Sequence, residues 1–187
     1  GETENVSPAV FIHIPEIDQI SREKKGRNFL NHGLKLLSFV PMLIMMCIIF
    51  RFSAQEAELS AKTSSAVGRA IVKASVRFFE REYTEEEIVQ RAAAIDGIVR
   101  KSAHMAEYAF LAFLVSIPLM TYGARGRMLL FLTFLIPALY ASTDEFHQTF
   151  VRGRSGTFKD VLIDCVGIIT YVIILKIFRR KKDFTQN

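Results

Sequence analysis

The stretch STDEFHQTFVRGR, residues 142–154, lies between two of the most apolar segments of this 187-residue chain. The segment before it is MLLFLTFLIPALYAST (128–143), and the segment after it is VLIDCVGIITYVIILKIF (161–178). Each is close to the roughly 20 residues that a helix needs to cross the core of a bilayer. A dense polar run between two such segments predicts two membrane-spanning helices joined by a short polar connection.

Two further apolar segments, residues 34–53 and 103–124, precede this pair. We therefore predict an all-α integral membrane protein with four transmembrane helices, whose spans lie at about 34–53, 103–124, 128–147 and 160–178.

The charge excess of +5, from 24 Lys and Arg against 19 Asp and Glu, is concentrated at particular places. Basic residues gather before the first span, in the short connection at 125–127 and after the last span. Because cytoplasmic loops of membrane proteins are enriched in Lys and Arg, both termini are predicted to be cytoplasmic. The basic residues are thus explained as topology signals, and no nucleic-acid partner is expected.

This orientation predicts the organisation of the chain. Residues 1–33 form a cytoplasmic N-terminal arm, residues 34–178 form the membrane domain, and residues 179–187 form a cytoplasmic basic tail. Between the first and second spans, residues 54–102 form an extracytoplasmic helical insertion.

The insertion has an amphipathic helical pattern. Apolar residues recur at helical spacing, beside a basic stripe. The stripe consists of Lys62, Arg69, Lys73 and Arg77. This pattern predicts a helix on an anionic membrane surface or, alternatively, a helix packed on the outer ends of the bundle with a solvated basic face. Thr84 followed by Glu87 predicts a capping box that starts a second outer helix, with Gly97 as a candidate break.

Polar side chains are expected at the outer ends of all four spans. The uncharged runs 36–50, 108–124 and 128–143 are each shorter than roughly 20 residues, so these helices must extend into polar sequence. The added residues are Ser53, Gln55, His104, Glu107, Asp144, Glu145 and His147, and Asp160 with Asp164 begin the fourth span. Ionisable groups at such depth cost several kcal/mol unless they pair or line a wet cavity. We therefore predict one shared pocket that opens outward.

The spacing of these groups indicates their chemistry. Lys101, His104 and Glu107 are successive i, i+3 neighbours on one helix face. Arg154 follows in a turn rich in glycine, and its guanidinium suits bidentate binding of phosphate beside acid and base groups. The predicted catalytic residues are His104, Glu107, Asp144, Glu145, His147 and Asp164. The predicted substrate-binding residues are Lys101, Arg154, Gln148, Ser53, Gln55 and Asp160.

Two of these assignments have alternatives. Thr157 three residues before Asp160 resembles a capping box, so Asp160 is expected to cap the fourth helix, to serve the site, or both. A divalent metal is the alternative to phosphate chemistry, and no other cofactor is predicted. Its ligands would be His104, Glu107, Asp144 and His147. Nearby Lys101 and Arg154 would repel a cation unless a phosphate lay between them.

Three stretches carry a resemblance to a known family: FRFSAQEAELSAKTSS (50–65), RKSAHMAEYAFLAFL (100–114) and ASTDEFHQTFVRGRSGTFKDVLIDCVG (141–167). Together they resemble the VanZ-like family of bacterial membrane proteins over roughly residues 34–178. For the founding members of the family, the resemblance implies a role in resistance to teicoplanin and related lipoglycopeptides in Gram-positive cell envelopes. It implies no established reaction, and at position 164 the family accepts Asp or Asn.

Residues and resemblance together predict a multi-pass protein of the bacterial cell membrane with an extracytoplasmic active pocket. We expect the pocket to bind, and to hydrolyse or transfer, a phosphate-bearing lipid such as a polyprenyl phosphate or pyrophosphate or a phospholipid. The expected partner is thus a membrane lipid or a lipid-linked cell-wall intermediate. The alternatives are a non-enzymatic binder of a lipid, cell-wall precursor or antibiotic acyl chain, and a purely structural polar cluster.

Overall fold

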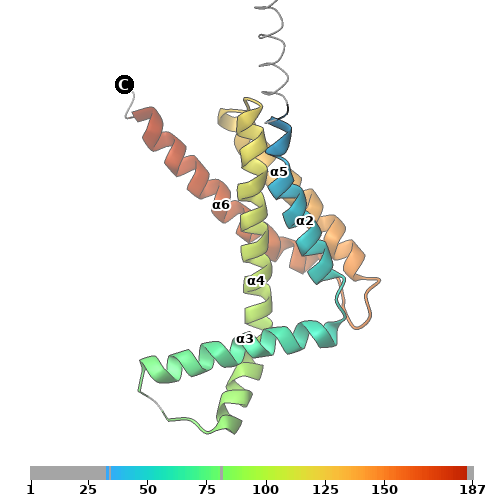
Figure 1. Cartoon of the computed structure of the whole chain (residues 1–187), viewed down its shortest axis with the longest axis vertical. Helices are drawn as coiled ribbons and strands as arrows, with labels where there is room; N and C mark the ends of the chain where they lie inside the picture. Colours follow the sequence, from blue (N-terminus) through green and yellow to red (C-terminus); the bar gives the residue numbers. More distant parts are fainter. Residues whose placement is uncertain (1–32, 34, 81, 185–187) are drawn as a thin grey trace, which may run out of the picture. The chain divides into compact units, whose positions relative to one another are not determined.

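The computed structural model describes residue 33, residues 35–80 and residues 82–184, with side chains up to residue 180. It divides the chain into residues 1–37 and residues 38–187, and every helix discussed below lies in the second unit. The predicted N-terminal arm, apart from Gly33, and the last three residues of the tail lie outside the described residues. The described residues form helices and connections without any strand, which confirms the predicted all-α class (Figure 1).

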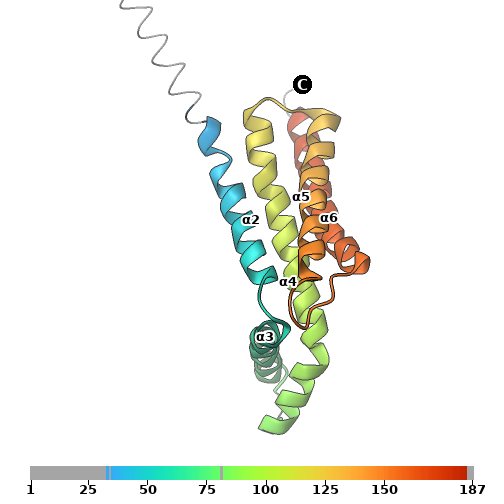
Figure 2. The same ribbon diagram turned by 90° about the vertical axis from the view of Figure 1, so that its right-hand side faces the viewer.

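Four helices carry the predicted spans: α2 (Val40–Ser53), α4 (Glu85–Thr121), α5 (Gly126–Gln148) and α6 (Phe158–Phe184). Within the described residues, four helical stretches are long and apolar enough to cross a membrane, which confirms this prediction. Figure 2 shows the four helices side by side, with the connection between α4 and α5 at one end and α3 (Ala57–Phe78) toward the other.

The long helix α4 starts at the predicted capping box. Thr84 Oγ1 accepts a hydrogen bond of 3.3 Å from the Glu87 N–H, and Glu87 Oε2 accepts one of 2.8 Å from the Thr84 N–H. The predicted break at Gly97 is wrong, because α4 continues without interruption for 37 residues. A single glycine costs a helix interior only about 1 kcal/mol, and both flanking segments of α4 are packed. At 1.5 Å per residue the helix is roughly 55 Å long, so it extends beyond a hydrocarbon core of roughly 30 Å.

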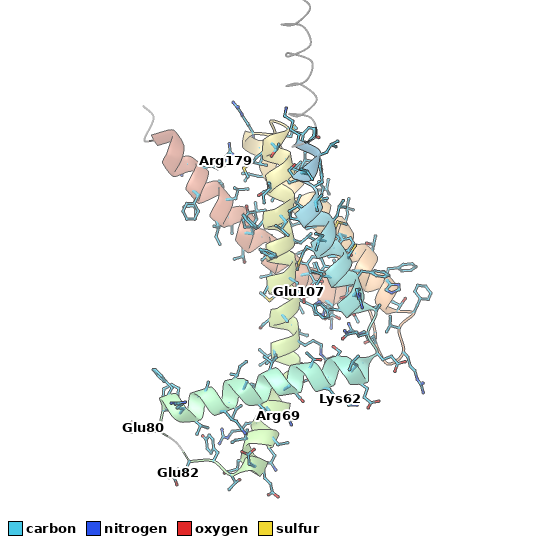
Figure 3. All side chains as sticks on the ribbon, in the orientation of Figure 1. Lys62, Arg69, Glu80, Glu82, Glu107 and Arg179 are labelled. Atoms are coloured by element: carbon cyan, nitrogen blue, oxygen red, sulfur yellow. The ribbon has the colours of Figure 1, made fainter. Side chains whose placement is uncertain are left out.

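Helix α3 packs across the first part of α4 through a narrow stripe. Ser64, Gly68 and Val72, spaced one turn apart, are its buried residues. A Cβ at Gly68 would lie 3.2 Å from the carbonyl oxygen of Ala92, so the two helices approach closely there. Val76 also packs against this contact, and Lys73 forms an ion pair of 3.0 Å with Glu85 of α4. Other residues stay exposed, namely Val67 and Ile71 on the apolar side and Lys62 and Arg69 on the basic side (Figure 3).

The core of the bundle lies between α2, α4, α5 and α6. Its buried residues include Ile49 of α2, Tyr108 and Leu111 of α4, Ala141 of α5 and Ile168 of α6. These residues pack where the helices converge, and large apolar side chains elsewhere on the spans remain exposed, as expected of a surface that faces lipid.

The backbones of α4 and α6 lie very close together where the two helices cross. A Cβ at Gly167 would run into the backbone of Met105, so only glycine fits at this crossing. Helix α2 is tied to α5 by a hydrogen bond of 2.6 Å, which the Tyr140 hydroxyl donates to the carbonyl of Met46. These contacts fix the ends of the helices that surround the polar residues described next.

Candidate functional site

The middle of α4, the last turn of α5 and the start of α6 surround a cavity of about 380 Å³. The connection between α5 and α6 forms part of its wall. Its charged and amide-bearing lining residues are Arg100, Lys101, His104, Glu145, Gln148, Arg154, Lys159, Asp160 and Asp164. Seven of these nine were predicted as site residues from the sequence, and Arg100 and Lys159 were not.

Arg154 is held in place by the tight connection that carries it. Gly153 adopts a positive φ of 75°, and a Cβ at Gly156 would run into the backbone of Glu145. The guanidinium of Arg154 donates hydrogen bonds to Gln148 Oε1 (3.2 Å) and to the carbonyl of Phe52 (3.0 Å). Contacts with α5 and with the end of α2 therefore orient this side chain.

Arg100 is the second guanidinium at the cavity. It donates a hydrogen bond of 2.8 Å to Asp96 Oδ2, and Ser64 of α3 donates one of 2.5 Å to Asp96 Oδ1. This chain of contacts anchors Arg100 to the packing of α3 on α4. Because a positioned guanidinium loses little freedom on binding, it is well suited to grip an anion.

Three buried nitrogens at the cavity lack a hydrogen-bond partner among the described residues. They are Nε of Arg100, Nε of Arg154 and Nδ1 of His104. A buried donor without a partner costs about 1–3 kcal/mol, so such groups are normally satisfied by a ligand or by water. Two guanidiniums with spare donors in one cavity match the requirements of a phosphate or another oxyanion.

The charges around Arg154 also favour a bound anion. Burial lowers the pKa of Arg154 below its usual value, and the nearby charge of Arg100 lowers it further, while Asp144 and Glu145 act in the opposite direction. An anion placed between the two guanidiniums would relieve their mutual repulsion.

His104 and Glu107 lie next to each other on α4. His104 Nδ1 is 3.8 Å from Glu107 Oε2, which is longer than a hydrogen bond. Both side chains are about three-quarters buried, with 21% and 25% of their surface exposed. A small movement or a bound ligand would bring them into the geometry of a base oriented by a carboxylate.

Three acidic side chains are almost fully buried beside the cavity. Asp144, Glu145 and Asp164 expose 2%, 5% and 1% of their surface. The Gln148 amide donates hydrogen bonds to Asp144 Oδ2 (3.3 Å) and Glu145 Oε1 (3.2 Å), and Glu145 Oε2 accepts one of 3.2 Å from the Thr157 N–H. Asp144 Oδ1 and Asp164 Oδ2 are buried without a partner among the described residues. The cavity is thus bordered by buried carboxyl groups, two of which have an oxygen without a partner in the described part of the chain.

Two hydroxyl groups lie deeper, next to Asp144. Ser53 at the end of α2 and Tyr108 of α4 both interact with its carboxyl group, although neither hydroxyl makes a hydrogen bond of standard geometry within the described chain. Ser53 was predicted as a binding residue, but it is not among the residues that line the main cavity. Tyr108 was not predicted.

His147 and Gln55 are not among the residues that line the main cavity. The imidazole of His147 stacks on the ring of Phe50, with centroids 4.6 Å apart. Gln55 and Glu107 instead line a second, smaller cavity beside the first. The structure thus separates His147 from His104, although the sequence assigned both to one cluster.

Asp160 lies at the start of α6, next to Thr157. The Asp160 N–H donates to Thr157 Oγ1 (3.3 Å), which is one half of a capping box. The other half is absent, because the Thr157 N–H donates to Glu145 and the Asp160 carboxylate accepts from Thr157 Oγ1 (2.7 Å) instead. Asp160 also lines the main cavity.

The alternative of a metal site stays a prediction. Within the described part of the chain, no three His, Cys, Asp or Glu side chains are grouped so as to hold a metal ion. His147, one of the four predicted ligands, packs on Phe50 instead.

Spacing along α4 held a signal that the sequence analysis missed. Arg100 lies four residues before His104, and Asp96 lies four residues before Arg100, so all three share one helix face. An i, i+4 step backward from His104, in place of the i, i+3 step that led to Lys101, would have found Arg100.

These features define a multi-pass helical membrane protein with a charged cavity among the ends of its spans. The sequence model of the VanZ/LLP1 family matches residues 35–179, which is most of the chain. The chain therefore belongs to the VanZ-like family, as the sequence resemblance indicated. No curated protein and no solved structure is detectably similar to it.

Proposed function

We propose that the cavity binds the phosphate-bearing head group of a lipid, and hydrolyses or transfers it. The observation that carries this proposal is the pair of guanidiniums, Arg100 and Arg154, whose Nε donors are buried and unpartnered within the described residues. Lys101 adds a further positive charge to the same lining. A phosphate has enough acceptor oxygens to satisfy several such donors at once.

His104 is the proposed general base, because it lines the cavity and lies close to Glu107. In hydrolysis, a water oxygen would form a bond to phosphorus while the bond from phosphorus to the lipid or phosphate leaving oxygen breaks. His104 would take the proton from the water, and a protonated carboxyl of the acidic cluster would give one to the leaving oxygen. Asp144, Glu145 and Asp164 are the candidates for that acid.

The proposed location is the bacterial cell membrane, with the cavity on the extracytoplasmic side. Arg125 ends the connection between α4 and α5, and Arg127 lies in the first turn of α5, at the other end of α4 from α3 (Figure 2). Under the positive-inside rule this end is cytoplasmic. The cavity would then face lipid-linked intermediates of cell-wall assembly, which fits the family link to teicoplanin resistance.

The test uses the full chain in nanodiscs of zwitterionic lipid. Undecaprenyl pyrophosphate, undecaprenyl phosphate and phosphatidic acid are each offered, and both lipid binding and release of inorganic phosphate are measured. The Arg154→Ala and His104→Ala variants are compared with Arg152→Ala, a matched control in the same connection whose side chain is exposed.

Binding and phosphate release that Arg154→Ala abolishes, with Arg152→Ala unaffected, support an enzyme. Binding without release from any of these lipids favours the alternative of a non-enzymatic binder. Absence of binding to all three lipids overturns the proposal. The link to resistance is tested by expressing the chain in a sensitive Gram-positive host, where an unchanged teicoplanin susceptibility would remove it.

A further inference from the structure

A second cavity of about 190 Å³ adjoins the charged one. Its apolar lining comes from three helices: Phe52 of α2, Val67 of α3, and Val99 and Ala103 of α4. Gln55, Thr63 and Glu107 also line it. The two cavities thus differ in character, since only the larger one is lined by Lys101, Asp160 and Asp164.

Three side chains line both cavities and lie between them. They are Arg100, His104 and Arg154, which carry the unpartnered donors described above. The proposed anion site therefore has a polar compartment on one side and a partly apolar compartment on the other. This is the arrangement that an amphiphile requires, with its charged group at the boundary and its hydrocarbon on the apolar side.

The smaller cavity is open to the surroundings of the bundle. Phe52 and Val67 are about half exposed, at 48% and 47%, although both line the cavity. Ile71, one turn further along α3, is exposed to the same degree, at 48%. A path lined by apolar side chains therefore leads from the anion site out between the end of α2 and α3.

We propose that the hydrocarbon chain of the lipid begins in this second cavity, and that the lipid reaches the site sideways from the membrane between α2 and α3. This inference rests on the proposed function and specifies its substrate as an amphiphile held in the bilayer. The cavity is smaller than the roughly 300–1,000 Å³ of typical ligand pockets, so it encloses only the first part of the chain. The remainder of the chain stays in the bilayer.

The experiment compares two probes with the same head group, ethyl phosphate and hexadecyl phosphate, on the full chain in phosphatidylcholine nanodiscs. Ala103→Phe and Val67→Trp fill the second cavity from opposite walls. Ala106→Phe is the matched control, because Ala106 is exposed on the same helix and lines neither cavity. Thermal melting shows which variants keep the wild-type fold, and two filling variants on different helices protect against the failure of one.

In each folded filling variant, we expect the affinity for hexadecyl phosphate to fall about tenfold, the loss that excluding roughly two methylene groups produces. Affinity for ethyl phosphate is expected to stay unchanged, and Ala106→Phe to alter neither. Unchanged binding of hexadecyl phosphate in both filling variants overturns the lateral route but leaves the proposed function intact. Failure of the wild-type chain to bind either probe overturns both.

Discussion

Arg154 donates a hydrogen bond of 3.0 Å to the backbone carbonyl of Phe52, although the two residues are 102 positions apart in the sequence. The bond ties the connection between α5 and α6 to the end of α2. It also directs the remaining donors of Arg154 toward the cavity, where Nε is buried without a partner among the described residues. One side chain thus serves both the fold and the proposed anion site.

Arg154→Lys is expected to weaken binding of ethyl phosphate by at least about tenfold. Lysine keeps the positive charge but lacks the planar set of donors that bonds Gln148, Phe52 and an oxyanion together. The dissociation constant is measured by titration in nanodiscs. Arg152→Lys, in the same connection, should bind like wild type, and equal affinity in the two variants would contradict the phosphate assignment.

Asp144→Asn separates chemistry from structure. The amide retains an acceptor for Gln148, so the fold should survive, whereas proton transfer by the carboxyl is lost. Lipid phosphate turnover should fall by about 100-fold or more, with little change in melting temperature. Ser142→Ala, an exposed position on the same helix, is the control. Wild-type turnover would exclude Asp144 from the reaction, and loss of folding would favour a purely structural cluster.

Gly167→Val tests the crossing of α4 and α6. A Cβ there runs into the backbone of Met105, so the helices must separate, which costs about 1–3 kcal/mol or more. The expected result is a clear fall in melting temperature in detergent. By contrast, Gly97→Ala meets no atom within 4 Å and should stabilise α4 by up to about 1 kcal/mol. If both variants melt alike, the close crossing is not important for stability.

Cysteine labelling tests the orientation. Glu82→Cys, in the connection between α3 and α4, should react with a membrane-impermeant maleimide on intact cells. Arg125→Cys, between α4 and α5, should react only after permeabilisation. The native Cys47 and Cys165 lie within the spans. The chain without an added cysteine therefore serves to measure the background labelling. The reverse labelling pattern would place the cavity in the cytoplasm and contradict a role at the outer surface.

The sequence predicted the helices well because their signals are local. The lengths of the apolar segments predicted the four spans, and Thr84 with Glu87 predicted the start of α4. The uninterrupted course of α4 through Gly97 was not predicted. A single glycine lowers helix stability by only about 1 kcal/mol, so its presence alone does not tell whether a helix continues.

The candidate site was predicted in composition but not in arrangement. Helical spacing placed Lys101, His104 and Glu107 on one face, and two of them line the main cavity. Spacing gives no information on how one helix is rotated against the next, so it did not reveal that His147 packs on Phe50. The role of Asp96 as an anchor was likewise hidden, because its partner Ser64 lies on another helix.

The continuity of α4 has a mechanical consequence. Arg100 belongs to the same rigid rod that carries α3 at its outer part, whereas Arg154 belongs to a connection anchored on α2 and α5. A movement of α4 relative to that connection would therefore change the separation of the two guanidiniums. In the proposed function, this separation would set how wide an anion the cavity accepts.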